Sequence, residues 1–143
     1  MTRQELEEWL QTDESKSVGQ SDGGGEVSPD LVVVRSGVGA FAAAVTRHFP
    51  SPHTPRRPKL LGVEPADAAC LLRSVEEGRI VSVPGPHHSI MVGLNCGRPS
   101  LVAWPIVSRG IDVLVALDDW PAREAVRLMA ASGVVSGETG LPA

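Results

Sequence analysis

Two short glycine-rich turns carry the residue types and spacing that can hold a phosphate group. The first turn consists of Ser36, Gly37, Val38, Gly39 and Ala40. It follows an apolar run at residues 31–34 and leads into the small residues 42–45. Glycines let the backbone approach an anion closely, and the first N–H groups of the following helix point at it. The helix dipole also favours negative charge there. This turn predicts a binding site for a phosphorylated cofactor.

The elements around these turns alternate between apolar strands and helices, which predicts an α/β fold with a parallel sheet and helices on both faces. The expected strands are residues 31–34, 60–63 and 111–117. The expected helices are residues 38–48, 66–77, 100–108 with an interruption at Pro105, and a last helix that ends near residue 132. Ligands of such sheets bind at the carboxyl ends of the strands. Because a second glycine turn follows at residues 136–140, we expect both turns to face one pocket.

We expect two parts along the chain. Residues 1–29 comprise a short helix at residues 3–10 and a linker rich in Ser, Asp and Gly. Residues 30–143 form the α/β domain. Within it, residues 81–99 form a long irregular segment, and such segments are usually functional.

Composition excludes several classes of function. The formal net charge is −4 and no basic stripe occurs, which argues against a nucleic-acid partner. The two cysteines, Cys70 and Cys96, are too few for a disulfide framework, so we expect a cytoplasmic location. The chain has no apolar run long enough for a membrane span. No Cys or carboxylate spacing supports a metal site beside His87 and His88, and we expect these two histidines to be a loop pair near the mouth of the pocket.

The glycine turn alone leaves two interpretations open. Residues 37–42 match the dinucleotide pattern G-x-G-x-x-A, and Glu64 follows the second strand, where an acid would bind a ribose hydroxyl. In the alternative interpretation, the glycines only make a tight turn between strand and helix, and Glu64 only caps the next helix.

The longer motifs favour a third interpretation. The chain has Gly-Val-Glu-Pro at residues 62–65, Gly-Leu-Asn-Cys-Gly at residues 93–97 and Ser-Gly-Glu-Thr-Gly at residues 136–140. In this order they resemble the C-terminal part of the diaminopropionate ammonia-lyases, members of the fold type II (tryptophan synthase β-like) superfamily of pyridoxal-phosphate enzymes. The resemblance covers about residues 30–140. It implies part of the large domain of such an enzyme.

The resemblance also implies a cofactor and an activity. The cofactor is pyridoxal phosphate, with its phosphate held by the turn of residues 36–40, and Ser136 matches the serine that faces the pyridine nitrogen. The implied activity is elimination of ammonia from 2,3-diaminopropionate to give pyruvate. The implied partners are an amino-acid substrate and either a second copy of the chain or a missing N-terminal half.

Catalysis with pyridoxal phosphate requires a lysine for the Schiff base. The chain has only Lys16 and Lys59, and neither stands in the family's sequence context, so we assign no catalytic residue and expect the chain alone to be inactive. Two alternatives remain open. One is a fragment of a serine or threonine dehydratase, and the other is a non-catalytic remnant that binds a phosphate-bearing ligand or a partner.

The remaining side chains with reactive or aromatic groups have simpler explanations. We expect Cys70 in the core, Cys96 in loop packing, and Trp104 and Trp120 in packing rather than stacking on a ligand. Asp118 or Asp119 is expected to cap the last helix.

Overall fold

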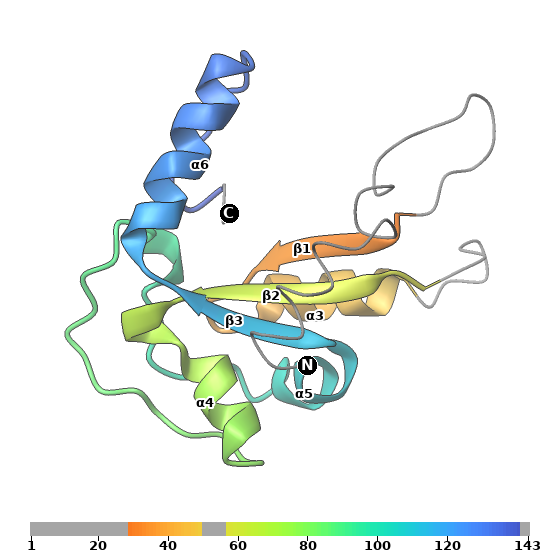
Figure 1. Ribbon diagram of the computed structural model, residues 1–143. Helices are drawn as coiled ribbons and strands as arrows, with labels where there is room; N and C mark the ends of the chain where they lie inside the picture. The colour runs from red at the N-terminus through yellow and green to blue at the C-terminus, as the bar shows by residue number, and fades with distance from the viewer. Residues whose placement is uncertain (1–28, 50–56, 141–143) are drawn as a thin grey trace.

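The computed structural model describes residues 29–49 and 57–140, and the predicted helix at residues 3–10 lies outside this part. Three parallel strands form the sheet in the order β1-β2-β3 (Figure 1). They are β1 (Leu31–Arg35), β2 (Lys59–Pro65) and β3 (Val113–Leu117). The predicted parallel sheet is therefore confirmed, with its strands placed to within about two residues.

Six helical segments accompany the strands in the described residues. They are α3 (Ala40–His48), η1 (Ala66–Ala68), α4 (Cys70–Glu76), η2 (Val92–Leu94), α5 (Trp104–Gly110) and α6 (Asp119–Ala131). Within the described ranges no helix is long and apolar enough to cross a membrane.

Two predicted helices differ from the observed ones. The predicted helix at residues 66–77 is broken at Ala69, whose ψ of 60° is not helical, so η1 and α4 are separate. The helix predicted at residues 100–108 was expected to be interrupted by Pro105. Instead α5 begins at Trp104 with Pro105 in its first turn. A proline costs little there, because the first N–H groups of a helix have no partner within it.

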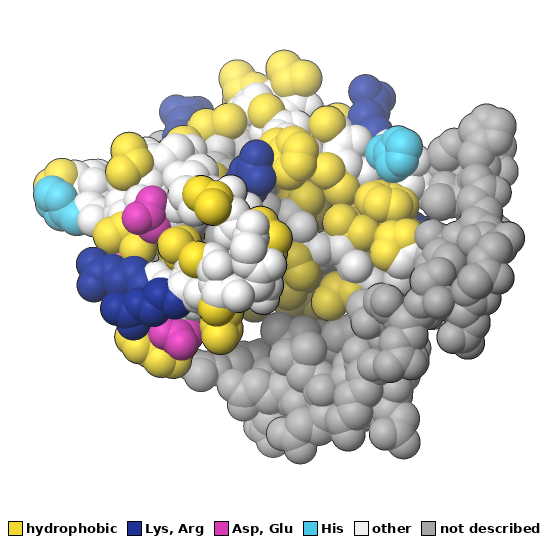
Figure 2. Space-filling model, turned by 90° about the horizontal axis from the view of Figure 1, so that it is seen from above, with side chains coloured by type: hydrophobic (Ala, Val, Ile, Leu, Met, Phe, Trp, Pro, Cys, Tyr) yellow, Lys and Arg dark blue, Asp and Glu magenta, His cyan; other side chains and the backbone are white. Residues whose placement is uncertain are grey.

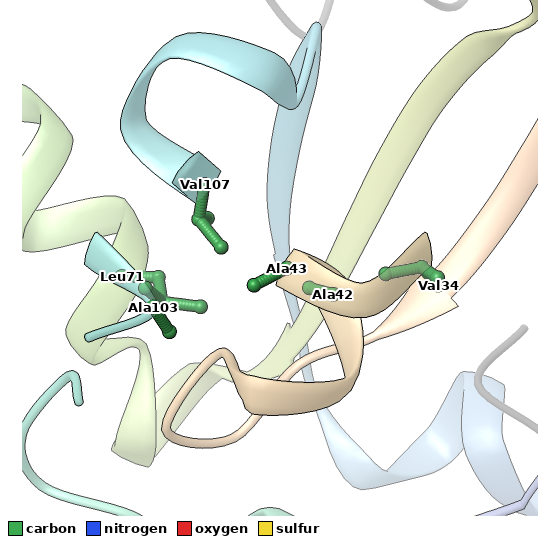
Figure 3. Close-up of a cluster of buried hydrophobic side chains, with 6 residues drawn as sticks. All are labelled: Val34, Ala42, Ala43, Leu71, Ala103 and Val107. Carbon is green, nitrogen blue, oxygen red and sulfur yellow. The ribbon is translucent and has the colours of Figure 1, made fainter. Parts of the chain in front are cut away.

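Small side chains let three helices pack closely on one face of the sheet. The buried cluster joins strand β1 to helices α3, α4 and α5 (Figure 3), and its members are Val34, Ala42, Ala43, Leu71, Ala103 and Val107. The helices α3 and α5 approach so closely that a Cβ on Gly110 would overlap the Thr46 side chain. Helix α6 stands apart from this cluster and packs through Ala122 on Met91 and Leu94.

Polar contacts connect β2 and β3 at the amino end of the sheet. Asp112 accepts a hydrogen bond from the backbone N–H of Leu60 at 2.7 Å and pairs with Arg57 at 3.0 Å. Arg57 also donates to the carbonyl of Gly110. These contacts fix the start of β2 against the start of β3.

Candidate functional site

The glycine loop, defined as residues 36–39, lies at the carboxyl end of β1 and leads directly into α3. Ser36 donates its backbone N–H to the carbonyl of Val63 at 2.8 Å, which continues the pairing of β1 with β2 beyond the strand. Gly39 has a φ of 92°, a conformation that L-residues with a side chain rarely adopt. An added Cβ there would also lie 3.3 Å from Leu71 Cδ2. The loop therefore requires glycine at this position.

Two successive carbonyl groups of the glycine loop are held by donors from elsewhere in the chain. The Cys70 thiol, at the start of α4, lies 3.6 Å from the carbonyl oxygen of Gly37 and donates to it. The backbone N–H of Ser100 donates to the carbonyl of Val38 at 2.8 Å. In a trans peptide unit the C=O and the following N–H point in opposite directions. The Cys70 thiol therefore directs the Val38 N–H away from itself, and the Ser100 N–H does the same for the Gly39 N–H.

Three successive N–H groups of the loop are left without an acceptor among the described residues. The carbonyl of Gly39 accepts from Ala43 N–H at 2.8 Å as the first bond of α3. The N–H groups of Val38, Gly39 and Ala40 have no acceptor in the part of the chain that the structure describes. Successive unpaired N–H groups at a helix start bind phosphate. The predicted phosphate turn thus has the donors that its role requires.

Three sequence motifs meet at this loop. A Cβ on Gly37 would lie 3.1 Å from Cys96 Sγ and 3.5 Å from the carbonyl oxygen of Gly93, so residues 93–97 pack directly on the glycine loop. The backbone N–H of Gly93 in turn donates to Thr139 Oγ1 at 3.2 Å. The C-terminal glycine turn therefore reaches the glycine loop through Gly93.

Ser136 opens this C-terminal turn. Its side chain is partly buried, and its hydroxyl donates to the carbonyl of Gly137 at 3.4 Å, a long hydrogen bond. The turn is closed by Gly140 N–H, which donates to the same carbonyl at 2.9 Å. Because the hydrogen bond from Ser136 to Gly137 is long and weak, the Ser136 hydroxyl remains available to a better acceptor.

The irregular segment, residues 81–99, is anchored to the start of α6. Asp119 accepts from the Ser89 hydroxyl at 2.7 Å and from Ile90 N–H at 3.2 Å. The amide of Asn95 donates to the carbonyl of Ser89 at 2.9 Å, and its Oδ1 is buried with no hydrogen-bond partner among the described residues. The segment is therefore held in place at Ser89, and Asn95 Oδ1 is its buried acceptor without a partner among the described residues.

This anchoring changes the expected role of the acidic pair. Asp118 occupies the N-cap position of α6 but makes no capping hydrogen bond through its side chain. Asp119 directs its carboxylate to the irregular segment instead. The predicted cap position is therefore confirmed at Asp118, but neither carboxylate caps the helix: Asp118 makes no side-chain capping bond, and Asp119 accepts from donors about 30 residues away in the chain.

A cavity of about 350 Å³ opens beside this anchor. Its lining residues are Asp67, His88, Ser89, Asp118 and Asp119. His88 donates its backbone N–H to Asp67 Oδ2 at 2.6 Å, and the ring Nδ1 of His87 lies 2.8 Å from the carbonyl oxygen of Asp67. Among the described residues, no group of three His, Cys, Asp or Glu side chains could hold a metal ion. The two histidines thus belong to a loop tied to Asp67.

Glu64 is fully buried, which excludes the ribose-binding role that the dinucleotide interpretation requires. Its carboxylate accepts from the backbone N–H groups of Leu71 at 2.9 Å and Leu72 at 2.8 Å, so it caps α4. Burial raises the pKa of Glu64 to about 7. Cys70 is also fully buried, as predicted, and burial followed by the nearby Glu64 raises the pKa of its thiol to about 12.

Lys59, the lysine within the described residues, lies at the end of the sheet opposite the glycine loop. Lys59 begins β2 and pairs with Leu31, the first residue of β1, whereas the glycine loop follows the last residue, Arg35. Four residues of strand separate the two ends by roughly 13 Å. Lys16 lies outside the described residues.

Apolar side chains are exposed around the glycine loop. Phe41 is 51% exposed, with Arg35 stacked 4.9 Å from its ring centroid, and Val38 and Leu101 are also exposed. Figure 2 shows hydrophobic side chains across much of the surface seen from above. Trp104 packs against the core as expected, but Trp120 is 71% exposed, so its predicted packing role is wrong.

Comparisons with known proteins agree on one family. The family described as "Pyridoxal-phosphate dependent enzyme" matches residues 18–143. Diaminopropionate ammonia-lyase of Salmonella typhimurium is 32% identical over 120 residues, which cover 78% of this chain and 30% of that protein. The Escherichia coli K12 enzyme is 32% identical over 119 residues, covering 80% and 30%. The chain thus spans about a third of the length of these relatives.

Solved structures share the fold. The holo form of diaminopropionate ammonia lyase from Escherichia coli superposes with a TM-score of 0.69 at 29% identity, covering 80% of this chain and 29% of that chain. A threonine deaminase from T.th. gives a TM-score of 0.73 at 26% identity, covering 80% and 40%.

Proposed function

The chain belongs to the pyridoxal-phosphate dependent enzyme family, and we propose that it forms the phosphate-binding side of an ammonia-lyase that acts on 2,3-diaminopropionate. The single observation that carries the proposal is the meeting of the glycine loop, residues 93–97 and the turn at residues 136–140. These are the segments through which the chain resembles such lyases.

The residues at the site fit the cofactor. Three unpaired N–H groups, those of Val38, Gly39 and Ala40, would hold its phosphate. The Ser136 hydroxyl would donate to the unprotonated pyridine nitrogen, and a neutral partner keeps the ring a weak electron sink, which suits elimination. When bound, pyridoxal phosphate supplies that sink for the electrons released at the substrate's α-carbon.

The chain alone is proposed to be inactive, because Lys59 lies at the opposite end of the sheet. The lysine would come from the N-terminal half of a complete enzyme, and the exposed apolar residues around the loop, Val38, Phe41 and Leu101, would contact that half or a second copy. Sedimentation of the purified chain tests this part, and a monomer at all concentrations contradicts self-association.

Titration with inorganic phosphate, followed by amide NMR shifts, tests the site. Addition of phosphate should shift the amides of Val38, Gly39 and Ala40. Gly39→Val should abolish these shifts, because its Cβ conflicts with Leu71 and with the positive φ. Gly78→Val, at a positive φ with open space around it, is the matched control and should bind as the parent does. Unchanged binding by Gly39→Val contradicts the proposed site.

Pyruvate formation from 2,3-diaminopropionate with added pyridoxal phosphate tests the predicted inactivity. We expect no turnover. Turnover that disappears in Lys16→Ala would make Lys16 the Schiff-base lysine and would disprove the proposed dependence on another half.

The TM-score of 0.73 to a threonine deaminase favours a serine or threonine dehydratase as the second candidate. Reconstitution with a polypeptide that carries the lysine half distinguishes the two. Ammonia-lyase activity predicts pyruvate from 2,3-diaminopropionate, whereas a dehydratase predicts products from serine or threonine. Phosphate binding without any turnover would favour the non-catalytic remnant.

A further inference from the structure

Arg35 and Phe41 lie on either side of the glycine loop in the chain and contact each other across it. Arg35 is the last residue of β1, and its backbone is fixed by pairing with Val63 of β2. Phe41 follows Ala40, the first residue of α3, whose N–H has no acceptor among the described residues. The Cζ atom of Arg35 lies over the Phe41 ring, 4.9 Å from its centroid. A cation is therefore held at the loop that offers its N–H groups to an anion.

The charge of Arg35 is not neutralised by the part of the chain that the structure describes. None of the carboxylates in this part lies within ion-pair distance of its guanidinium; the ion pairs found there involve other arginines. The Phe41 ring has no acceptor atom, so the contact with it leaves the five N–H donors of the guanidinium to other groups. A guanidinium held in this way can bind an oxyanion through two parallel hydrogen bonds.

The glycine loop itself lacks such a charge. Residues 36–40 carry no ionisable side chain, and the first turn of α3 has no acidic one. An anion at the loop meets the partial positive charge of the N–H groups and of the helix dipole, which is equivalent to roughly half an elementary charge. This partial charge does not balance a phosphate dianion. Arg35, directly before the loop, supplies a full positive charge.

We propose that Arg35 is a second anion-binding group of this site and that its guanidinium donates to an oxygen of the phosphate held by the loop. Phe41 is a positioning residue, because it holds the guanidinium and has no donor of its own in its side chain. The inference rests on the proposed function, since it assumes that the loop binds the phosphate of the cofactor. It adds to that function a charged side chain that sets the strength of phosphate binding.

The probe is sulfate, because it is a dianion throughout the neutral pH range. The full chain is titrated with sulfate at constant ionic strength, and NMR follows the amides of Val38, Gly39 and Ala40 together with the side-chain Nε–Hε signal of Arg35. We expect the Arg35 signal to move with the same dissociation constant as the loop amides. Movement of the loop amides with a constant Arg35 signal would overturn the inference and leave the proposed function standing.

Variants of Arg35 measure its contribution. Arg35→Gln removes the charge, and we expect the dissociation constant for sulfate to rise about three- to tenfold, the range of a partly exposed hydrogen bond to a charged group. Arg35→Lys keeps the charge and should bind sulfate more tightly than Arg35→Gln. Arg47→Gln removes the same charge in the last turn of α3 and is the matched control, which should bind as the parent does. Equal losses in Arg35→Gln and Arg47→Gln would assign the effect to net charge and contradict the proposal.

Phe41→Leu tests whether the ring acts through Arg35. Leucine is also apolar but offers no ring face to a cation. We expect Phe41→Leu to weaken sulfate binding in the parent and not in Arg35→Gln, so that the two effects are not additive. Additive losses would show that Phe41 does not hold the guanidinium.

The Arg35 signal of the parent requires no substitution, so this readout serves even if a variant fails to fold. It also separates the two proposals. If the Arg35 signal moves while no loop amide does, the loop is not the phosphate site and the proposed function fails, whereas Arg35 remains an anion-binding group. If neither signal moves, both proposals fail.

Discussion

Gly93 and Thr139 are joined by a hydrogen bond from the backbone N–H of Gly93 to Thr139 Oγ1, at 3.2 Å across 46 positions of the chain. Gly93 also packs on Gly37, so this bond connects the C-terminal turn with the glycine loop. A side chain at position 93 would not fit, because its Cβ would lie 2.9 Å from Thr139 Cγ2.

Thr139→Val tests this connection. Valine keeps the shape of threonine but removes the hydroxyl, so the Gly93 N–H loses its acceptor. We expect a loss of roughly 1 kcal/mol in the free energy of local opening, seen as several-fold faster hydrogen exchange at Gly93. Thr139→Ser keeps the hydroxyl and should exchange as the parent does. Equal protection in the valine variant would show that the bond contributes nothing.

Gly39→Ala should destabilise the protein more than Gly78→Ala. Both glycines have a positive φ, but only Gly39 has a neighbour in the way, Leu71 at 3.3 Å. We expect about 1 kcal/mol for Gly78→Ala and about 2 kcal/mol or more for Gly39→Ala. Urea unfolding of the two variants gives both values, and equal losses would mean that Leu71 adjusts freely.

Asp119→Asn should loosen the irregular segment, whereas Asp118→Asn should not. Asp119 accepts from Ser89 and Ile90 through its carboxylate, and removal of its charge weakens both bonds. We expect a loss of about 1–2 kcal/mol for Asp119→Asn and less than about 0.5 kcal/mol for Asp118→Asn. Hydrogen exchange at Ile90 should rise in the first variant alone; a rise in both would assign the effect to the charge at the start of α6.

Glu64 should make the protein less stable as the pH rises. Its pKa is raised from 4.5 to about 7 in the folded state, so the protonated carboxyl stabilises the fold fully below pH 4.5. This contribution is lost as the pH rises through 7, and its size is at most roughly 3 kcal/mol. Unfolding at pH 5 and pH 8 should show a smaller difference in Glu64→Gln than in the parent. An identical pH dependence in both proteins would mean that Glu64 has an ordinary pKa when folded.

Local sequence signals predicted the strands and the glycine loop correctly. The apolar runs before Ser36 and Glu64 are continuous, and Gly37 and Gly39 mark the turn without reference to any distant residue. The break at Ala69 could not be seen in this way. It depends on the Glu64 carboxylate, which takes the N–H groups of Leu71 and Leu72 and so starts α4 later than its residue types indicate.

The candidate site was also predictable only in part, because its contacts join residues that are far apart in the chain. Both glycine turns were expected near one pocket, but the contact that links them depends on Gly93, in the short helix η2 that the sequence analysis did not predict. Asp119 has the residue type of a helix cap and begins α6, and only the position of Ser89 in space shows why its carboxylate points elsewhere.

The polar contacts of Arg57 and Asp112 hold the strands together at one end of the sheet, so the strands need not be held by the loops at the other end. They fix β2 against β3 at the end of the sheet opposite the glycine loop. We therefore expect that segments at the other end, including residues 81–99 and 136–140, can be replaced by other sequences while the strands keep their alignment. The chain offers a small scaffold in which the chemistry of the pocket can be redesigned one loop at a time.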